Sequence, residues 1–525
     1  MAHVWLAPTP ARTMSRSLLP ASPTASPSVV VRMVRGAARE SYLVLLVCAA
    51  ASLLLLGIGL FVMTDTWLAL VAGRAVATSG PPATDSLTTW TLGRDWVDQQ
   101  WLGQFVLYEI WRAGGLVLVG LVHVVVVIGT FVMCLTGARR RGGSTRHVAG
   151  VGLLAVLPIG LVAANIRTQT FALALFALVL WLLAEDSRRP SGRVFWCFPL
   201  LALWANVHGS VIAGAALVVL AGVASIAAGV RSRRPPQLAR GAVMIGMAAV
   251  ALLITPYGFG LFSYLGDLFG NPEIARISSD WMPTTLEPVQ IPFFLLAGLT
   301  VALIARHRDE LTLFELLALL LVIVGALAAQ RNLAWFGLAA VLLVPALLTR
   351  GRADPAGPPP PVRVAAAVSA IGVAGVVVAG IAGLTAVGRQ VESTYPAAAA
   401  EIVAHELAAD RSLRVMTHPQ YADWLLFRYP QLAGRIPFDI RFELLTPAEL
   451  RRFRRFRDQV GADWRGALGG ARLVVLDSSD KPLEVLPPTS AVLLREPGAR
   501  QLYGRHHVSV ILRPTPASAS RRPER

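Results

Sequence analysis

The chain has 525 residues, of which 55% are hydrophobic and 15% are charged. This balance excludes an ordinary soluble globular protein and is typical of a membrane protein with many spans. The formal net charge is +17, and Lys481 is the only lysine, so arginines carry the positive charge. Because these arginines stand between apolar runs, we expect them to orient helices in a membrane, and we predict no nucleic-acid partner.

Residues 1–40 are rich in Ser, Pro and Arg and are predicted to form a disordered basic arm in the cytoplasm. The first apolar run, 42–63, has no small-residue cleavage site after it, so we interpret it as a retained helix and not as a signal peptide. Cys48, Cys134 and Cys197 all lie in apolar runs and lack the spacing of metal ligands. We predict no cofactor.

Eleven apolar runs approach or reach the roughly 17–25 residues that cross a bilayer. These runs are 42–63, 115–136, 148–164, 168–184, 194–206, 209–230, 241–256, 291–305, 311–328, 332–348 and 364–387. Every second connection is rich in arginine, and such loops stay on the cytoplasmic side. These connections are 138–147, 185–193, 231–240, 306–310 and 349–363.

The pattern therefore predicts a polytopic α-helical membrane protein with about 11 transmembrane helices. Its N-terminus is expected inside and its C-terminus outside the plasma membrane, with residues 41–388 as the transmembrane domain and 64–114 as a long outer loop. From residue 389 the chain is polar, and 389–525 is predicted to form a small extracytoplasmic α/β domain.

In this domain we expect strands at 414–417, 435–443, 471–477 and 506–513, and helices at 421–429 and 447–460. These segments contain no catalytic constellation. We interpret their charged residues as structural; they include Asp423, Asp439, Arg441 and Glu443.

Three tight turns on the predicted outer side carry polar residues. The first contains Arg167, WANVHGS (204–210) contributes His208, and AQRNLAW (329–335) contributes Arg331 and Asn332. A single arginine at a helix end commonly extends to the lipid headgroups, and a single histidine in a turn is commonly structural. The recurrence on one side, together with acidic outer loops, predicts a membrane-surface pocket for an anionic group such as a lipid phosphate.

The outer loop 64–114 begins with Asp65, which heads an amphipathic stretch that GPP ends at 80–82. A second amphipathic stretch, WLGQFVLYEIW (101–111), leads to two glycines at 114–115 before the next apolar run. Both stretches are expected to lie along the membrane interface. Asp65 is also a candidate helix N-cap, a role that does not exclude catalysis.

Topology and loop together resemble the GT-C class of integral-membrane glycosyltransferases over roughly residues 42–350. The resemblance rests on an acid after the first span, a basic residue in the next helix, a Gly-Pro break, a further acid, a PYG motif and an outer arginine. These are Asp65, Arg74, Gly80–Pro81, Asp85, 256–258 and Arg331. The chain departs from this class at two positions. Thr66 stands where many members carry a second acid, and Gln100 in DQQWL stands where an acid is expected, so we predict no metal site.

The resemblance implies transfer of a sugar from a polyprenyl-phosphate-linked donor to an acceptor at the outer face of the membrane. It implies that Asp65 is the catalytic general base for an acceptor hydroxyl and that Arg331, with Arg167 or His208 as further candidates, stabilises the departing lipid phosphate. The expected substrate-binding residues are Asp85, Asp98, Arg167, His208, Arg331 and Asn332.

Three alternatives stay open. A transporter or flippase would place paired charges near the bilayer midplane, often within internal repeats. A lipid-linked polysaccharide ligase or polymerase would also bind lipid phosphate with outer arginines, but it more often carries its large loop late in the chain. In a non-enzymatic membrane scaffold, Asp65 and the arginines would have no chemical role.

Overall fold

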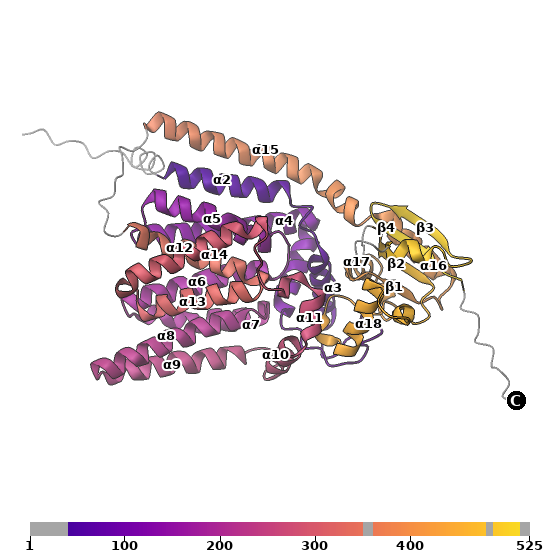
Figure 1. Cartoon of the computed structure of the whole chain (residues 1–525), viewed down its shortest axis with the longest axis horizontal. Helices are drawn as coiled ribbons and strands as arrows, with labels where there is room; N and C mark the ends of the chain where they lie inside the picture. The colour runs from indigo at the N-terminus through magenta and orange to yellow at the C-terminus, as the bar shows by residue number, and fades with distance from the viewer. Residues whose placement is uncertain (1–39, 350–360, 479–486, 515–525) are drawn as a thin grey trace, which may run out of the picture.

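The computed structural model describes residues 40–349, 361–478 and 487–514. A bundle of long helices and a smaller domain with a sheet lie end to end along the long axis of the molecule (Figure 1). The predicted arm 1–40 falls almost wholly outside the described residues, as does most of the connection 349–363.

Each of the eleven apolar runs is helical. The corresponding helices are α2 (Ser41–Leu56), α4 (Trp101–Arg140), α5 (Thr145–Ala163), α6 (Gln169–Arg188), α7 (Cys197–Val207), α8 (Val211–Ser232), α9 (Pro235–Leu252), α12 (Ile291–His307), α13 (Leu313–Ala328), α14 (Leu333–Thr349) and α15 (Val362–Thr394). Within the described residues, seven helices are long and apolar enough to cross a membrane, and three shorter apolar helices accompany them. The protein is a polytopic membrane protein.

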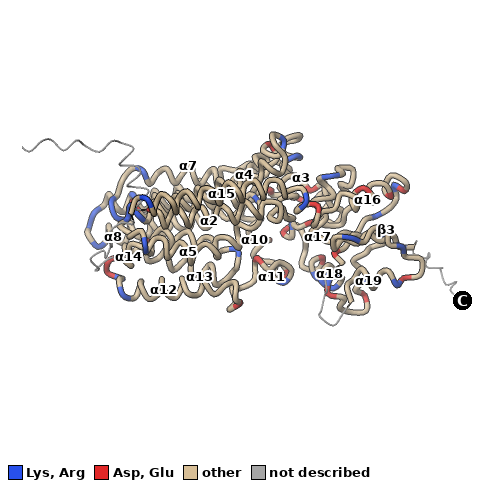
Figure 2. Tube along the Cα trace, turned by 90° about the horizontal axis from the view of Figure 1, so that it is seen from above, with Lys and Arg blue, Asp and Glu red and all other residues tan. Residues whose placement is uncertain are grey.

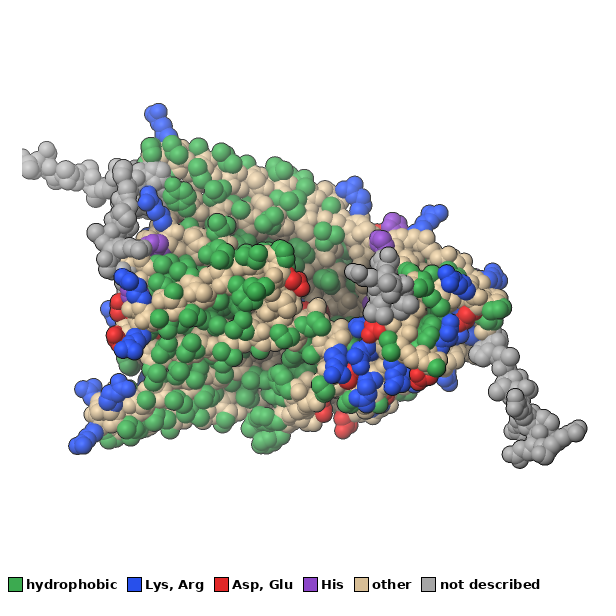
Figure 3. All heavy atoms as spheres, viewed as in Figure 1, with side chains coloured by type: hydrophobic (Ala, Val, Ile, Leu, Met, Phe, Trp, Pro, Cys, Tyr) green, Lys and Arg blue, Asp and Glu red, His purple; other side chains and the backbone are tan. Residues whose placement is uncertain are grey.

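The surface of the bundle fits a lipid environment. Hydrophobic side chains cover its visible face, while charged side chains gather at its two ends and on the smaller domain (Figure 3). Large apolar side chains such as Leu53, Val125 and Leu153 are more than 60% exposed. In water such a surface would cost free energy, whereas in a bilayer it is the favourable arrangement.

The centre of the bundle is α14, in which every residue from 333 to 347 is buried. It packs against α4, α5, α12 and α13. At the edge, α15 packs along α2, where the backbone of Gly383 approaches the Leu55 carbonyl so closely that a Cβ would collide with it. Close backbone approach at glycine is a common way for membrane helices to pack.

The loop 64–114, called the first outer loop after its predicted side, contains the two predicted helices. The helix α3 (Thr64–Ser79) ends at Gly80, whose φ of +79° suits glycine. The second helix forms the start of α4 and is separated from the membrane run by non-helical backbone at Gly114 and Gly115. The PYG motif contacts the Gly-Pro break, because Tyr257 Oη donates a hydrogen bond to the Pro82 carbonyl at 2.9 Å.

The smaller domain, called the outer domain after the side on which it is predicted to lie, has a four-stranded sheet in the order β1-β2-β4-β3, with β1 parallel to β2 and the other pairs antiparallel. Its strands are β1 (Val415–Thr417), β2 (Leu473–Asp477), β3 (Arg500–Arg505) and β4 (Val508–Leu512). Its helices are α16 (Ala397–Ala409), α17 (Pro419–Arg428), α18 (Pro447–Asp458) and α19 (Thr489–Leu493). The predicted helices at 421–429 and 447–460 are confirmed by α17 and α18, and three of the four predicted strands are confirmed.

The predicted strand at 435–443 is wrong. This segment forms one bridge, between Ile436 and Thr88 of the first outer loop, and then ends in the 3₁₀ turn η7 (Phe442–Leu444). Pro437 cannot donate to a sheet ladder, and Arg441, which follows it, forms an ion pair with Asp85 of the loop instead. The strand β3 was not predicted, because it is a mostly exposed edge strand without apolar alternation.

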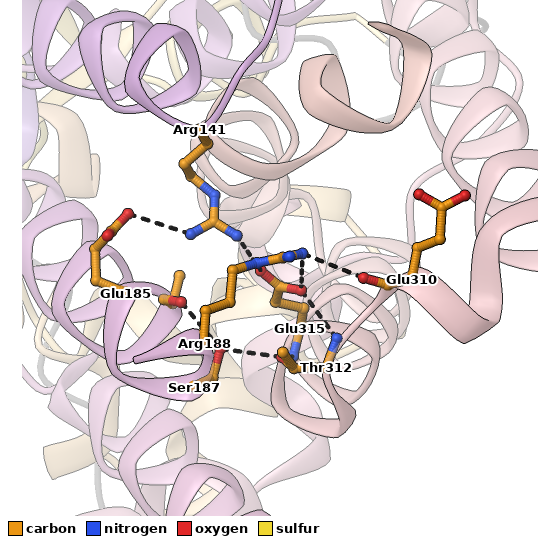
Figure 4. A network of polar contacts seen from close by, with 8 residues as sticks. Arg141, Glu185, Ser187, Arg188, Glu310, Thr312 and Glu315 are labelled. Atoms are coloured by element: carbon orange, nitrogen blue, oxygen red, sulfur yellow. Dashed lines mark hydrogen bonds and ion pairs between the residues drawn. The ribbon is translucent and has the colours of Figure 1, made fainter. Parts of the chain in front are cut away.

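Arginine is abundant at the end of the bundle that lies away from the sheet, whereas the middle of the bundle is nearly free of charge (Figure 2). At the arginine-rich end, Glu315 is 1% exposed and pairs with Arg141 and with Arg188 Nη2, the latter at 2.7 Å (Figure 4). Glu185 contacts Arg141 from the surface at 3.3 Å. This cluster joins the ends of α4, α6 and α13, because one buried carboxylate neutralises arginines from two helices.

We predict that Glu315→Ala strongly destabilises the protein, because it leaves the buried Arg141 guanidinium without its main counter-charge; breaking a buried pair costs about 3–5 kcal/mol. Glu185→Ala, whose carboxylate is 55% exposed, should have little effect. Thermal unfolding of the purified protein in nanodiscs measures both. Equal unfolding temperatures for the two variants would contradict this role of the cluster.

Candidate active site

A cavity of about 560 Å³ lies at the ends of the helices that are nearest to the sheet domain. Its walls come from α3, α6, α8, α13 and α14, from the connection around α10 (Gly260–Gly270), and from η7 of the outer domain. The part contributed by α8 and α13 is apolar, and the remainder carries carboxylates, amides and arginines. Five of the seven predicted site residues line it: Asp65, Arg167, His208, Arg331 and Asn332.

Asp65 lies in the first turn of α3, and its side chain is 37% exposed. Its Oδ2 accepts a hydrogen bond from Asn165 Nδ2 at 2.6 Å and lies 3.7 Å from Arg167 Nη1. The N-cap role considered for Asp65 is wrong: Met63 is the N-cap, and Thr66 Oγ1 accepts a hydrogen bond from its N–H. Two neighbours thus orient the carboxylate, as a positioned base requires.

Thr66 explains why a second acid is missing after Asp65. The Thr66 side chain is buried and donates a hydrogen bond to the Ile166 carbonyl at 2.6 Å. A carboxylate here would face a carbonyl oxygen with no donor between them, so the local packing requires a hydroxyl. Gln100, the other departure, lines the cavity and accepts a hydrogen bond from Thr168.

Arg167 is held between two carboxylates. Its Nη1 lies 2.9 Å from Asp280 Oδ2, in addition to its contact with Asp65. Burial alone would lower the pKa of Arg167, but these two charges raise it above its ordinary value. Burial alone would raise the pKa of Asp280, but the charge and hydrogen bond of Arg167 hold it below its usual range. Arg167 is therefore a fixed cation that orients acids.

Arg331, in the turn η5 (Gln330–Asn332), is placed differently. Its guanidinium lies over the Trp281 ring, 4.2 Å from the centroid. Within the described part of the chain, it forms no ion pair or hydrogen bond with another side chain. Its neighbour Asn332 donates a hydrogen bond from Nδ2 to the Gly325 carbonyl and so closes the end of α13. Arg331 is thus a cation of the cavity whose donors are available to an anionic ligand.

His208 follows α7 and is 7% exposed. Its Nδ1 accepts a hydrogen bond from the Ser210 backbone N–H at 3.0 Å. Burial, with the charges of Arg331 and Arg167, holds the pKa of His208 well below its usual value. The ring is therefore neutral at pH 7, with its proton on Nε2, and acts as a hydrogen-bond donor.

Asp85 and Asp98, predicted to bind substrate, lie outside the cavity lining. Asp85 is 1% exposed; its oxygens accept from the Leu87 N–H and from threonine hydroxyls, and Arg441 Nη1 lies 2.8 Å from its Oδ1. Asp98 is 2% exposed, and burial raises its pKa to about 7. Their positions favour a structural role at the joint between the outer loop and the outer domain.

The outer domain contributes residues that were expected from the sequence to be structural. Arg441 and Glu443 both line the cavity. Arg441 is held by Asp85 and by Asp439 Oδ2 at 2.7 Å, and it lies over the Trp96 ring at 4.3 Å. Burial raises the pKa of Glu443 to about 7.

No local pattern marked Glu443 as a site residue, because a fold across more than 300 residues brings it to the cavity. Asp423 and Asp439, in contrast, are buried and do not line it.

No group of His, Cys, Asp and Glu suited to a metal ion occurs among the described residues. No protein-family model matches the chain, and no curated protein matches it in sequence. Among solved structures, ArnT from Cupriavidus metallidurans bound to undecaprenyl phosphate is 15% identical, with a TM-score of 0.49 over 90% of this chain and 97% of that chain. AglB is an oligosaccharyltransferase from Archaeoglobus fulgidus, in complex with an inhibitory peptide and a dolichol-phosphate. It is 11% identical, with a TM-score of 0.47 over 83% of this chain and 69% of that chain.

ArnT and AglB are GT-C membrane glycosyltransferases. Because identity and TM-score are low, the activity proposed for this protein rests on the residues of its own chain.

Two of the acids with a raised pKa, Asp98 and Glu443, give a prediction on stability. The folded protein holds protons at Asp98 and Glu443 up to about pH 7, whereas carboxyls of an unfolded chain lose theirs near pH 4. Lowering the pH from 8 to 6 should therefore stabilise the fold and raise its unfolding temperature by a few degrees.

Asp98→Asn should raise the unfolding temperature at pH 8 and weaken this pH dependence, while the exposed Asp95→Asn should leave it unchanged. Tryptophan fluorescence during heating at several pH values is the measurement. An undiminished pH dependence in Asp98→Asn would show that Asp98 is ionised in the fold.

Proposed function

We propose that the protein transfers a sugar from a polyprenyl-phosphate-linked donor to an acceptor at the outer face of the plasma membrane. One observation carries the proposal: an oriented carboxylate, Asp65, shares a cavity with a cation, Arg331, that forms no ion pair with a carboxylate of the described chain. A base and a free cation in one cavity are what glycosyl transfer from a phosphate requires.

The proposed topology has eleven transmembrane helices, with the N-terminus inside and the C-terminal domain outside the cell. Its support is the arginine-rich end of the bundle opposite the sheet domain (Figure 2), since positive loops stay cytoplasmic. In this orientation the cavity opens at the outer surface, between the membrane and the outer domain.

A lipid donor fits the apolar wall. Residues of α8 and α13, among them Ile212, Leu217 and Leu321, line the cavity next to the polar groups. A prenyl chain bound along this wall stays in apolar surroundings, while its phosphate reaches Arg331 and the Nε2–H of His208.

In the proposed reaction the acceptor oxygen attacks the anomeric carbon of the sugar and forms the new glycosidic bond. Asp65 takes the proton of the acceptor hydroxyl. The bond between the anomeric carbon and the phosphate oxygen breaks, and the lipid phosphate leaves with the electron pair. Arg331 and His208 stabilise the charge that develops on this phosphate.

The test is transfer from radiolabelled polyprenyl-phosphate sugars in membranes that contain wild type, Asp65→Asn or Arg331→Ala. Both variants should lose about 100-fold or more of the activity, because a general base or a charge-stabilising donor contributes at least that much. The matched control is Arg276→Ala, an arginine that is 57% exposed, pairs with Glu273 and lies outside the cavity.

Expression and membrane insertion of each variant are measured in parallel. Undiminished transfer in Asp65→Asn would exclude Asp65 as the base. Undiminished transfer in both variants would exclude this cavity as the active site.

A further inference from the structure

One wall of the cavity belongs neither to the apolar helices nor to the Asp65–Arg167 pair. It is formed by Gln99 before α4, Tyr264 on α10 and Glu443 in η7. These residues come from the first outer loop, the later outer connection and the outer domain. The structure thus brings three distant segments together at one polar surface.

Gln99 shows that this surface has unused hydrogen-bonding capacity. Its side chain is 94% buried, and its Nε2 donates a hydrogen bond to Tyr264 Oη at 3.0 Å. Its Oε1 is buried and has no hydrogen-bond partner among the described residues. A buried amide oxygen left unpaired costs free energy, so this position favours a ligand that donates a hydrogen bond.

Tyr264 and Glu443 extend this surface. Because Tyr264 Oη accepts the hydrogen bond from Gln99, its own O–H is available as a donor. Glu443 forms no hydrogen bond or ion pair with another side chain of the described residues. Its position is nonetheless fixed, since Arg441, two residues earlier, is held by Asp85 and Asp439.

We propose that Gln99, Tyr264 and Glu443 form a second subsite of the cavity, which binds the hydroxyl groups of the acceptor. The subsite rests on the proposed function. Its acceptor oxygens and phenol donor suit a polyhydroxylated molecule, such as a saccharide or a hydroxylated lipid headgroup. Because η7 belongs to the outer domain, the acceptor enters from the side of this domain.

The subsite has a structural basis at Gly209 as well. A Cβ at this glycine would lie 3.1 Å from Gln99 Oε1 and 3.4 Å from the Tyr264 ring. Glycine therefore keeps open the space in front of the unpaired oxygen.

The experiment measures two products from one radiolabelled polyprenyl-phosphate sugar: label on the envelope glycans and lipids of the membranes, and free sugar released by transfer to water. The variants are Glu443→Ala, Glu443→Gln and Gln99→Leu. The control is Glu401→Gln, an exposed carboxylate of α16 outside the cavity.

We expect Glu443→Ala and Gln99→Leu to lose about 10- to 100-fold of the transfer to envelope acceptors, as for the loss of a hydrogen-bonding partner in a binding site. Release of free sugar should fall much less, because the donor and Asp65 are untouched. Glu443→Gln keeps an amide oxygen and should retain more transfer than Glu443→Ala.

Equal transfer to envelope acceptors in the wild type, Glu443→Ala and Gln99→Leu would overturn the subsite while leaving the proposed function intact. A parallel loss of both products would also overturn it, because such a loss indicates a structural role. Wild-type protein that forms neither product would contradict the proposed function itself, and the subsite with it.

Discussion

The buried charge of Arg441 is the constraint on which the arrangement of this protein depends. Its guanidinium is 2% exposed and is neutralised by Asp85 from the first outer loop and Asp439 from its own domain. Removing Arg441 would leave the two buried carboxylates without their counter-charge, a cost of several kcal/mol. The outer domain is thereby fixed on the loop, and Glu443 is placed in the cavity. Arg74, which donates hydrogen bonds to the Leu426 and Phe427 carbonyls, strengthens the same joint.

Arg167 and Arg331 both lie in turns between helices, but their surroundings differ. Arg167 lies between Asp280 and Asp65, so its charge is already balanced, and it serves to orient the Asp65 carboxylate. Arg331 stacks on Trp281 and keeps its donors for a ligand. This difference has a physical reason. An arginine that binds phosphate needs a charge that the protein does not neutralise, whereas an arginine that orients a base needs to pair with that base. Both arginines line one cavity.

Much of the fold could be predicted from the sequence, because apolar runs, glycine breaks and helix caps are local signals. The sequence also predicted that Asp65 and Arg331 would lie near each other at one end of the helices, because both flank apolar runs. Asp85 was predicted to bind substrate from its place in a motif, but its oxygens are used within the fold. Glu443 was overlooked for the opposite reason: its segment has the alternation of a strand, and only its ion-paired neighbour Arg441 turns it into the cavity. Ion pairs between residues that are hundreds of positions apart produce no periodic pattern in a single sequence, so they could not be predicted from it.

The most direct measurement is the binding of undecaprenyl phosphate and of undecaprenol to the protein in nanodiscs, followed by native mass spectrometry. If Arg331 binds the lipid phosphate, the wild type should prefer the phosphate by about 10-fold or more, in line with a charge-assisted hydrogen bond. Arg331→Ala should lose this preference, and Arg276→Ala should keep it. An undiminished preference in Arg331→Ala would contradict the proposed role of Arg331, because the cavity would then hold the phosphate by other groups.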